Sequence, residues 1–389
     1  MNTKTFITKA FMTAVVLAIG LMTSCSSDSE DSAAEKGDRM LTLSITTKSV
    51  TRGTVLESDP GATEDVINRL VIGIFNDDGN AVKIQEFTSD TWTEPSAGNI
   101  QVVVSAQYLV NGNRVMAIAN APSTANFATC STLDEFKTRA ISVKDALANS
   151  TADKEKTTEF AMVGNSRISA VGSGNVNFTA SITLYHMVAK VSLLPITLDF
   201  SQNKLYPNAQ FSVSDIYLYN VPSSKTFWYT SDTGASVYYS GNSDDTSFAE
   251  YLGNNGATLD MTKTHYLYTL PNGETGGNAT KLVIKGVFKP TSTSAGSTSY
   301  YPIYLDYIAP TIAGGSGTAA TGDLPDYAGE IGLTARTPKV VYANDNYKIN
   351  VTIKSVGAPS AEQDLDPQAV QVTVAVAPWT DLNQSATFE

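Results

Sequence analysis

The chain has 389 residues, 42% hydrophobic and 16% charged, which is enough to form the cores of two ordinary folded domains. Its formal net charge is −12 and its lysines and arginines are scattered. This excludes the basic stripe that neutralises phosphates, so no nucleic acid is expected as a partner. Thr, Ser, Val, Tyr, Asn and Gly recur throughout the chain and predict a mainly β protein.

Residues 1–24 have the features of an export signal. Lys4 and Lys9 are followed by an apolar stretch over residues 10–22, which is too short to span a bilayer comfortably as a helix. The end of this region, "LMTSC", resembles a bacterial lipobox. The resemblance implies cleavage before Cys25 and a lipid on its thiol. The alternative is an ordinary secretory signal in which this cysteine is incidental.

Residues 25–52 are expected to form a removable propeptide. The polar, acidic stretch "SSDSEDSAAEKGD" predicts a tether, because it cannot bury enough apolar surface to fold. Leu41, Leu43 and Ile45 then alternate with polar residues, which predicts a strand with one apolar face. Arg52 and Gly53 follow among Ser and Thr, in a segment typical of an exposed loop that a protease can enter. We predict a cut between them; the alternative is a plain surface arginine in a linker.

Strand patterns and one helical pattern fill residues 53–194. "RLVIGIFNDDGNAV" predicts a hairpin that turns at Asp78-Gly79, and "NIQVVVS" and "NRVMAIANA" predict further strands. The segment "STLDEFKTRAISVKDALANS" predicts a helix. Thr132 and Glu135 have the spacing of a capping box there, and Leu133, Phe136 and Leu147 offer an apolar face.

The longest alternating run, "NVNFTASITLYHMVAKVSLLP", ends near Pro195, and strand patterns continue beyond it to the end of the chain. In "NYKINVTIKS" the residues Tyr347, Ile349, Val351 and Ile353 share one face. In "AVQVTVAVAPW" the residues Val370, Val372, Val374 and Val376 do the same. Such patterns indicate half-buried antiparallel sheets. We predict two β-sandwich domains in tandem, at residues 53–194 and 195–389, with a short helical insertion in the first.

Residues suited to catalysis or metal binding are few, so neither an enzyme, a cofactor nor a metal centre is expected. Only His186 and His265 could serve a nucleophilic triad, and each lies beside strand-like apolar residues. Zinc would need more Cys or His ligands. The carboxylates in "FNDDGN" and "GNSDDTS" are explained by turns, with calcium as the alternative. Cys130 is expected to be packed rather than reactive.

The end of the chain carries a more specific signal. An "N-x-x-Y-x-I-x-V-T-I" strand is followed by an alternating strand that reaches Trp379 and by the tail "QSA". This run resembles the end of the FimA-type (type V) fimbrillins, the major fimbrial subunits of Bacteroides and Porphyromonas. "YYPIYLDY", "STLDEFKTRAIS" and "HMVAKVSL" also resemble family segments, although His186 stands where arginine is common. The matching end residues are Asn344, Tyr347, Ile349, Val351, Thr352, Ile353, Trp379, Gln384, Ser385 and Ala386.

The resemblance implies transthyretin-like sandwich domains and a function in a cell-surface fimbria that mediates adhesion. Family members are made as lipoproteins, anchored at the outer membrane, and trimmed after an arginine by a trypsin-like protease. Trimming opens a groove that the carboxy-terminal strand of another subunit fills. The implied partners are further copies of the chain, accessory fimbrial subunits, the protease, the lipoprotein export machinery and an unidentified surface receptor.

By this resemblance the donor strand lies within about residues 369–389. Its expected contact residues are Val370, Val372, Val374, Val376, Trp379 and Phe388. Trp379 could equally well be a core residue at a strand end. Two alternatives to a shaft subunit are an accessory, tip or anchor subunit and a glycan-binding surface lipoprotein. The latter would use aromatic residues such as Trp92, Trp228 and Tyr229.

Overall fold

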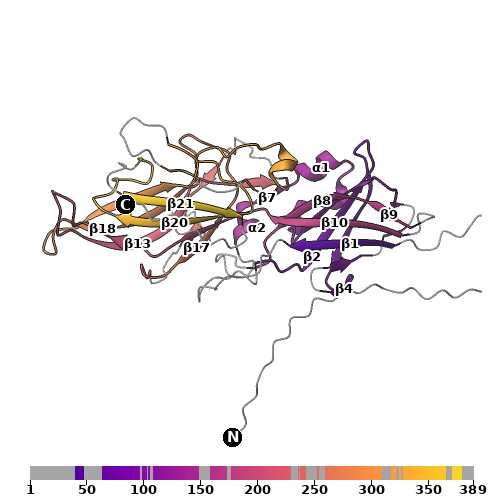
Figure 1. The fold of residues 1–389 in the computed structure, drawn as a ribbon, viewed down its shortest axis with the longest axis horizontal. Helices are drawn as coiled ribbons and strands as arrows, with labels where there is room; N and C mark the ends of the chain where they lie inside the picture. Colours follow the sequence, from indigo (N-terminus) through magenta and orange to yellow (C-terminus); the bar gives the residue numbers. More distant parts are fainter. Residues whose placement is uncertain are drawn as a thin grey trace, which may run out of the picture. The chain divides into compact units, whose positions relative to one another are not determined.

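The computed structural model shows a mainly β protein, as the sequence predicted (Figure 1). The chain divides into two compact units, residues 1–37 and 38–389, and the described residues all belong to the second. The structure describes residues 40–47, 64–96, 99–102, 104–105, 108–148, 158–172, 177–228, 235, 237–241, 252–253, 259–308, 317–320, 324–325, 327–364 and 370–378.

A seven-stranded sheet occupies the first half of the described chain, with the strand order β1-β10-β8-β6-β2-β3 and with β9 paired to β10. Its strands are β1 (Met40–Thr47), β2 (Arg69–Phe75), β3 (Ala81–Thr88), β6 (Arg114–Ala119), β8 (Met162–Arg167), β9 (Ser169–Val171) and β10 (Asn177–His186). The predicted β2–β3 hairpin is confirmed, and Gly79 takes a φ of 81° in its turn. Only glycine adopts such a backbone conformation without strain.

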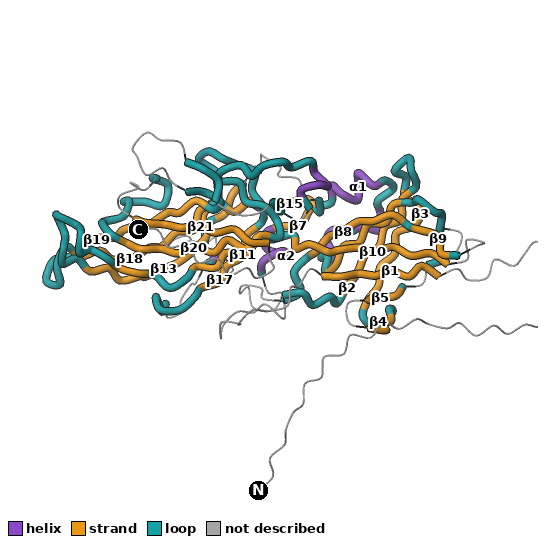
Figure 2. The backbone as a smooth tube through the Cα atoms, viewed as in Figure 1, coloured by secondary structure: helices purple, strands orange, loops and turns teal. Residues whose placement is uncertain are grey.

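Both faces of this sheet are covered, because the residues of β2 alternate between two apolar clusters. Leu70, Ile72 and Ile74 pack in one cluster, whereas Val71 and Phe75 pack in the other. The second face lies against the helices α1 (Leu133–Thr138) and α2 (Val143–Leu147) and the 3₁₀ turns η2 (Ser123–Ala125) and η3 (Phe127–Thr129). Figure 2 shows these short helices in purple beside the orange strands.

The predicted single helix after residue 131 is wrong in one respect, because a strand divides it. Thr132 caps α1 as expected, and its hydroxyl oxygen accepts a hydrogen bond from the backbone N–H of Glu135 at 3.1 Å. The helix ends at Thr138, and β7 (Ala140–Ser142) then pairs with β15 (Ser224–Thr226). The partner lies more than eighty residues away, so tertiary pairing overrides a continuous local helical pattern here.

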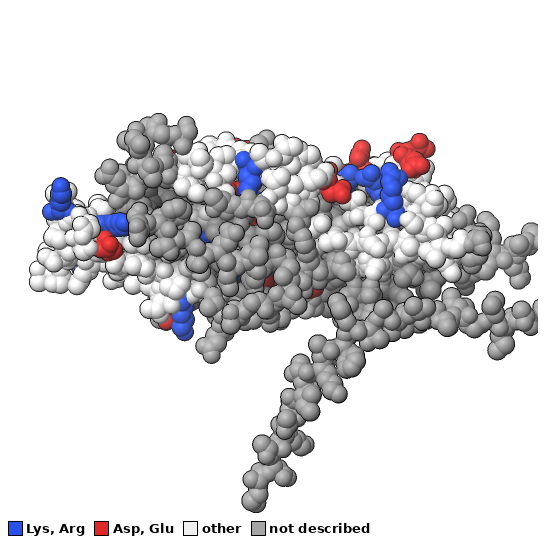
Figure 3. Space-filling model, viewed as in Figure 1, with Lys and Arg blue, Asp and Glu red and all other residues white. Residues whose placement is uncertain are grey.

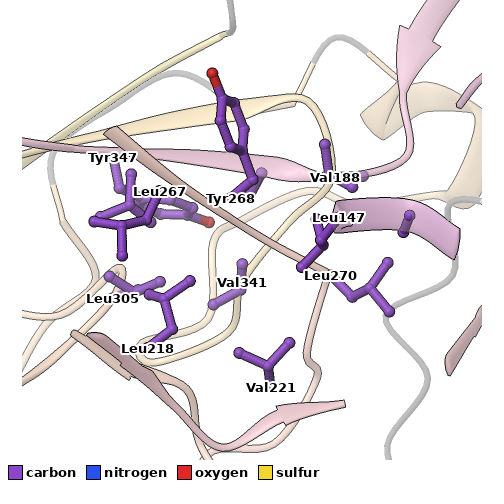
Figure 4. Packing of buried hydrophobic residues seen from close by; sticks show 14 of the residues in the cluster. Leu147, Val188, Leu218, Val221, Leu267, Tyr268, Leu270, Leu305, Val341 and Tyr347 are labelled. Carbon is purple, nitrogen blue, oxygen red and sulfur yellow. The ribbon is translucent and has the colours of Figure 1, made fainter. Parts of the chain in front are cut away.

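A five-stranded and a three-stranded sheet form the second half. The former contains β11 (Ala189–Leu193), β12 (Thr197–Leu198), β17 (His265–Thr269), β20 (Asp345–Ile353) and β21 (Val370–Pro378). The latter contains β13 (Gln210–Tyr219), β18 (Lys281–Lys289) and β19 (Ser297–Tyr304). Side chains from both fill one core, in which Leu267 and Tyr347 lie opposite Leu218 and Leu305 (Figure 4).

The chain changes from the first sheet to the second at Met187 and Val188, between β10 and β11. β11 pairs with β17 and β20, so this change comes before the domain boundary expected at residues 194 and 195. The small elements are β4 (Thr93–Ser96), β5 (Asn99–Gln101), β14 (Val221–Pro222), β16 (Tyr238–Tyr239) and the 3₁₀ turn η5 (Ala328–Ile331).

Candidate functional site

β1 is the end strand of the seven-stranded sheet and runs parallel to β10. All eight of its residues pair in register, with Leu41 opposite Phe178 and Ile45 opposite Ile182. Because successive strand residues point to opposite faces, Leu41, Leu43 and Ile45 share one face, and each is at most 1% exposed. The predicted apolar strand before the expected cut is therefore confirmed as a strand with a buried face.

These three side chains pack in an apolar cluster. Its other members come from the seven-stranded sheet, from β5 and from the segment that follows β5. β1 contacts β5, and Ile100, Val102 and Val104 from this region are buried in the same cluster. The sheet contributes the buried residues Leu70, Ile72, Ile74, Val115, Ala117, Ala119, Phe178, Ala180, Ile182 and Leu184. Removing β1 would leave an apolar groove beside the unpaired backbone edge of β10, which is a template for another strand.

The burial of its apolar side chains stabilises β1 in its place beside β10. Each buried Leu or Ile side chain contributes roughly 1.5–3 kcal/mol, so the three together contribute at most about 5–9 kcal/mol. The backbone pairing with β10 adds to this. A strand of eight residues is about 26 Å long at about 3.3 Å per residue, which is the length that a replacement strand would have to fill.

The first residue described after β1 is Glu64, which is charged and buried. The carboxylate of Glu64 forms an ion pair with Lys190 of β11, with 3.0 Å between Oε1 and Nζ. The hydroxyl of Tyr268 on β17 donates a hydrogen bond to the same Oε1. Lys190 and Tyr268 belong to the five-stranded sheet, so Glu64 fixes the chain after β1 to the second half of the protein. We call Glu64, Lys190 and Tyr268 the Glu64 anchor.

His186, at the end of β10, lies beside this anchor. Its imidazole Nε2 is 3.3 Å from Oδ1 of Asp65, and its backbone N–H donates to Oδ1 of Asn344 at 3.0 Å. Burial raises the pKa of the Asp65 carboxyl, although the His186 imidazole pulls it down. His186 is buried where a core-edge position was predicted, and its contacts connect the two halves. The other histidine, His265, is half-buried on β17 and lies 2.9 Å from the carbonyl oxygen of Asp260.

β21 carries the predicted carboxy-terminal strand and lies along β20. The two are antiparallel over nine residue pairs, with Val370 opposite Ile353, Val374 opposite Ile349 and Val376 opposite Tyr347. Val374 is buried in the core of the second half. The predicted common face of Tyr347, Ile349, Val351 and Ile353 is confirmed, since all four side chains are fully buried. Val372 pairs with Val351.

The remaining predicted site residues lie outside the described residues; they are Cys25, Arg52, Gly53, Trp379 and Phe388.

A second buried ionic group lies at the start of β20. Nε of Arg336 is 2.8 Å from Oδ2 of Asp306, and the same guanidinium binds Asp345 through Nη2. Burial raises the pKa of Asp345 to about 7 and that of Asp306 to about 6, although Arg336 lowers both. One arginine faces two buried carboxylates, so its single charge only partly offsets the rise in pKa that burial causes in both.

The described ranges contain neither a candidate metal-binding group nor a candidate membrane-spanning helix. No group of three or more His, Cys, Asp or Glu residues there could hold a metal ion. No helix of the described part is long and apolar enough to cross a membrane. Cys130 is packed as predicted, with its sulfur 3.1 Å from Nε of Arg139. In "FNDDGN" the backbone N–H of Gly79 donates to the carbonyl oxygen of Asn76, which closes a turn around the two aspartates. Most of "GNSDDTS" lies outside the described residues.

The surface likewise shows no large charged patch among the described residues visible in Figure 3, where both signs lie scattered over a largely uncharged face. Two of the three aromatic residues named for glycan binding are described, and they pack against different apolar clusters. Trp92 packs partly buried against the cluster below β1, whereas Nζ of Lys137 lies 4.2 Å from the ring centre of Trp228. Tyr229 lies outside the described residues.

Residues 40–186, from β1 to the end of β10, match the family model of the major fimbrial subunit protein FimA. The resemblance to the FimA-type fimbrillins is confirmed. The matched segment starts at the first residue of β1 and ends at the last residue of β10, the strand with which β1 pairs. The match supports a fimbrial structural protein.

Solved structures show the same fold at low sequence identity. A candidate cell adhesion protein from Parabacteroides distasonis is similar with a TM-score of 0.59 and 17% identity, over 88% of this chain and 100% of that one. A fimbrilin from Porphyromonas gingivalis W83 is similar with a TM-score of 0.57 and 15% identity, over 89% and 99%. A candidate cell adhesion protein from Bacteroides eggerthii is similar with a TM-score of 0.56 and 16% identity, over 88% of this chain and 96% of that one. No curated protein sequence matches the chain.

Proposed function

We propose that this fimbrillin is a shaft subunit of a cell-surface fimbria, mediates adhesion and polymerises by protease-triggered strand exchange. The observation that carries the proposal is the placement of β1. It is an edge strand with a fully buried apolar face, and only four residues separate it from the predicted cut site at Arg52. One cut would leave β1 attached only by non-covalent contacts. Its departure would expose the groove that a second copy requires.

The proposed sequence of events begins with export as a lipoprotein through Cys25 and anchoring at the outer membrane. An arginine-specific, trypsin-like protease then cuts between Arg52 and Gly53. The Glu64 anchor supports this order, because it holds the chain after the cut while β1 leaves. Before the cut, β1 occupies the groove and keeps the precursor monomeric.

The donor strand is proposed to come from residues 369–389 of another copy. β21 is already paired with β20, and taking it out would open the core around Val374. The printed sequence continues for eleven residues after Pro378, which is enough to fill a groove of eight residues. Val370, Val372, Val376, Trp379 and Phe388 remain proposed contact residues, in β21 or after it.

The proposed domains follow the same division. Residues 53–194 would form the first domain and 195–389 the second, and each would be a transthyretin-like sandwich. The pairing of β11 with β17 and β20 supports moving the boundary to residues 187 and 188. The common core of the five-stranded and three-stranded sheets supports a sandwich in the second domain.

The test is limited trypsin treatment of purified residues 26–389, followed by intact mass, amino-terminal sequencing and negative-stain microscopy. The expected product starts at Gly53 and forms filaments, and Arg52→Ala should abolish both. A discrete cut without polymers would favour an accessory or tip subunit. Absence of any discrete cut would overturn the switch. Deleting residues 380–389 should leave a folded monomer that cannot polymerise; continued assembly would place the donor in β21 itself.

A further inference from the structure

The chain that connects β20 to β21 crosses to the other sheet of the second half on its way. Ala358 exchanges two backbone hydrogen bonds with Tyr300 of β19, at 2.8 and 2.9 Å. Three residues later, Ala361 is buried against Tyr217 of β13 and Val283 of β18. We call residues 358–364 the strap. It covers the face of the three-stranded sheet that is turned away from the core, because Leu218, Leu282 and Ile303 point into the core from the same strands.

Lys281 of β18 holds the end of this strap. Its side chain is only 2% exposed, and Nζ lies 3.0 Å from the carbonyl oxygen of Glu362 and 3.3 Å from Oδ1 of Asp364. The carbonyl oxygen of Ala361 lies 3.5 Å from the same nitrogen. A buried ammonium donates three hydrogen bonds at most, and Lys281 directs its donors at three neighbouring acceptors of one segment.

Tyr304 of β19 completes the arrangement. Its hydroxyl donates to Oδ1 of Asp364 at 2.6 Å, and its ring lies 4.6 Å from Nζ of Lys281. Burial would raise the pKa of the Asp364 carboxyl, but the Tyr304 hydroxyl and the Lys281 ammonium outweigh it and hold that pKa below its usual value. The Asp364 side chain is nevertheless 63% exposed, so the strap is held at its edge rather than sealed inside.

We infer that Lys281 is a positioning residue that fixes the point from which the carboxy-terminal strand can move. The inference rests on the proposed strand exchange, because it concerns the strand from which the donor is expected. Sixteen residues separate Ile353 from Val370, but only five separate Asp364 from Val370. With the strap held, β21 is tethered by the short segment; with the strap released, it is tethered by the long one.

The tether length determines how often β21 detaches from β20. The entropic cost of closing a loop of n residues grows as (3/2)RT ln n. Lengthening the tether from five to sixteen residues therefore lowers the equilibrium constant for pairing β21 with β20 about sixfold. Releasing the strap should therefore raise the open fraction of β21 about sixfold. The strap thus keeps β21 paired within its own subunit and limits how far the chain beyond β21 reaches.

Hydrogen–deuterium exchange of uncleaved residues 26–389 tests this, because it reports on β21 separately from the strap and the other strands. In Lys281→Met, amide exchange should rise in residues 358–364 and rise up to about sixfold in residues 370–378, while β13 and β2 keep their wild-type rates. The matched control is Lys289→Met, which removes a half-buried lysine from the same strand and should change neither segment. Asp364→Asn provides a second variant at an exposed side chain in case Lys281→Met does not fold.

Faster exchange in the strap without any change in β21 would overturn the inference, as would an equal rise in every sheet, which would mean general destabilisation. Unchanged exchange in both Lys281→Met and Asp364→Asn would also overturn it. These measurements need neither cleavage nor polymerisation. A chain that shows the expected exchange but forms no filaments after trypsin would refute the proposed function and leave the tethering by Lys281 intact.

Discussion

The first and last described strands, β1 and β21, have similar alternating sequences but are held in different ways. β1 pairs in parallel with β10, and its buried side chains belong to the cluster on the face of the first sheet opposite the helices. β21 pairs antiparallel with β20 and extends the core of the second half. The chain before β21 is fixed by the strap, whereas the expected cut lies directly after β1. In the proposed strand exchange, β1 would leave and β21 would stay.

The anchors on the two sides of the cut site sharpen this contrast. β1 is held by apolar contacts and backbone pairing, while the chain after the cut is held by the buried ion pair between Glu64 and Lys190. Removal of β1 therefore leaves the Glu64 anchor untouched. A subunit without β1 would keep its two halves connected while its groove stays open.

The largest expected effect comes from Glu64→Gln, which removes the carboxylate charge 3.0 Å from the buried ammonium of Lys190. Removing one partner of a buried ion pair costs about 3–5 kcal/mol, and the free energy of unfolding should fall by that amount in urea titrations. Because the anchor is independent of β1, the loss should be equal before and after cleavage at Arg52. The exposed Glu86→Gln, whose carboxylate pairs with Arg69 at the surface, should cost less than about 1 kcal/mol. A loss confined to the uncleaved chain would contradict the proposed role of the anchor.

A smaller effect separates the two strands directly. Leu43→Ala should destabilise the uncleaved chain by about 3 kcal/mol, because it leaves a cavity in a fully buried site. After trypsin removes β1, the same substitution should have no effect. Val374→Ala should cost about 2 kcal/mol in both forms, because β21 stays in place. Urea unfolding of both variants, with and without cleavage, measures all four values. If Leu43→Ala still destabilised the trimmed chain, β1 would not have left.

The strands were predictable from sequence because burial on one face leaves a period of two. Leu41, Leu43 and Ile45 show it, as do Tyr347, Ile349, Val351 and Ile353, and all seven are buried. The local signal of the cap at Thr132 was equally readable. Such features depend only on neighbouring residues, which is why the sequence alone carries them.

Contacts between distant segments were not predictable. Nothing near Glu64 in the sequence indicates that Lys190 and Tyr268 surround it, and nothing near Ala140 indicates pairing with Thr226. The strap depends on Lys281 meeting residues about eighty positions later. A buried Lys or Glu has no periodic pattern of its own, so only the folded chain reveals its partner.

The smallest expected effect is a pH dependence that belongs to the β20 side of the molecule. The folded-state pKa of Asp345 is about 7, above its unfolded value near 3.8, so the folded chain binds more protons between these values. Stability is then highest at low pH within this window and falls as the pH rises from about 4 to about 7. The change is spread over about three pH units, so this one carboxyl contributes at most about 0.7 kcal/mol in any half-unit step of pH. The neighbouring Asp306, with a pKa of about 6, adds to the slope in its lower part.

Asp345→Asn should flatten the upper part of this profile in urea titrations at half-unit pH steps, whereas the exposed turn variant Asp78→Asn should keep the wild-type slope. Cleavage at Arg52 should not alter the difference between wild type and Asp345→Asn, because β1 and its buried neighbours are apolar. A difference that disappeared on cleavage would mean that β1 and β20 are energetically coupled. The two strands would then not be the independent elements that the structure describes.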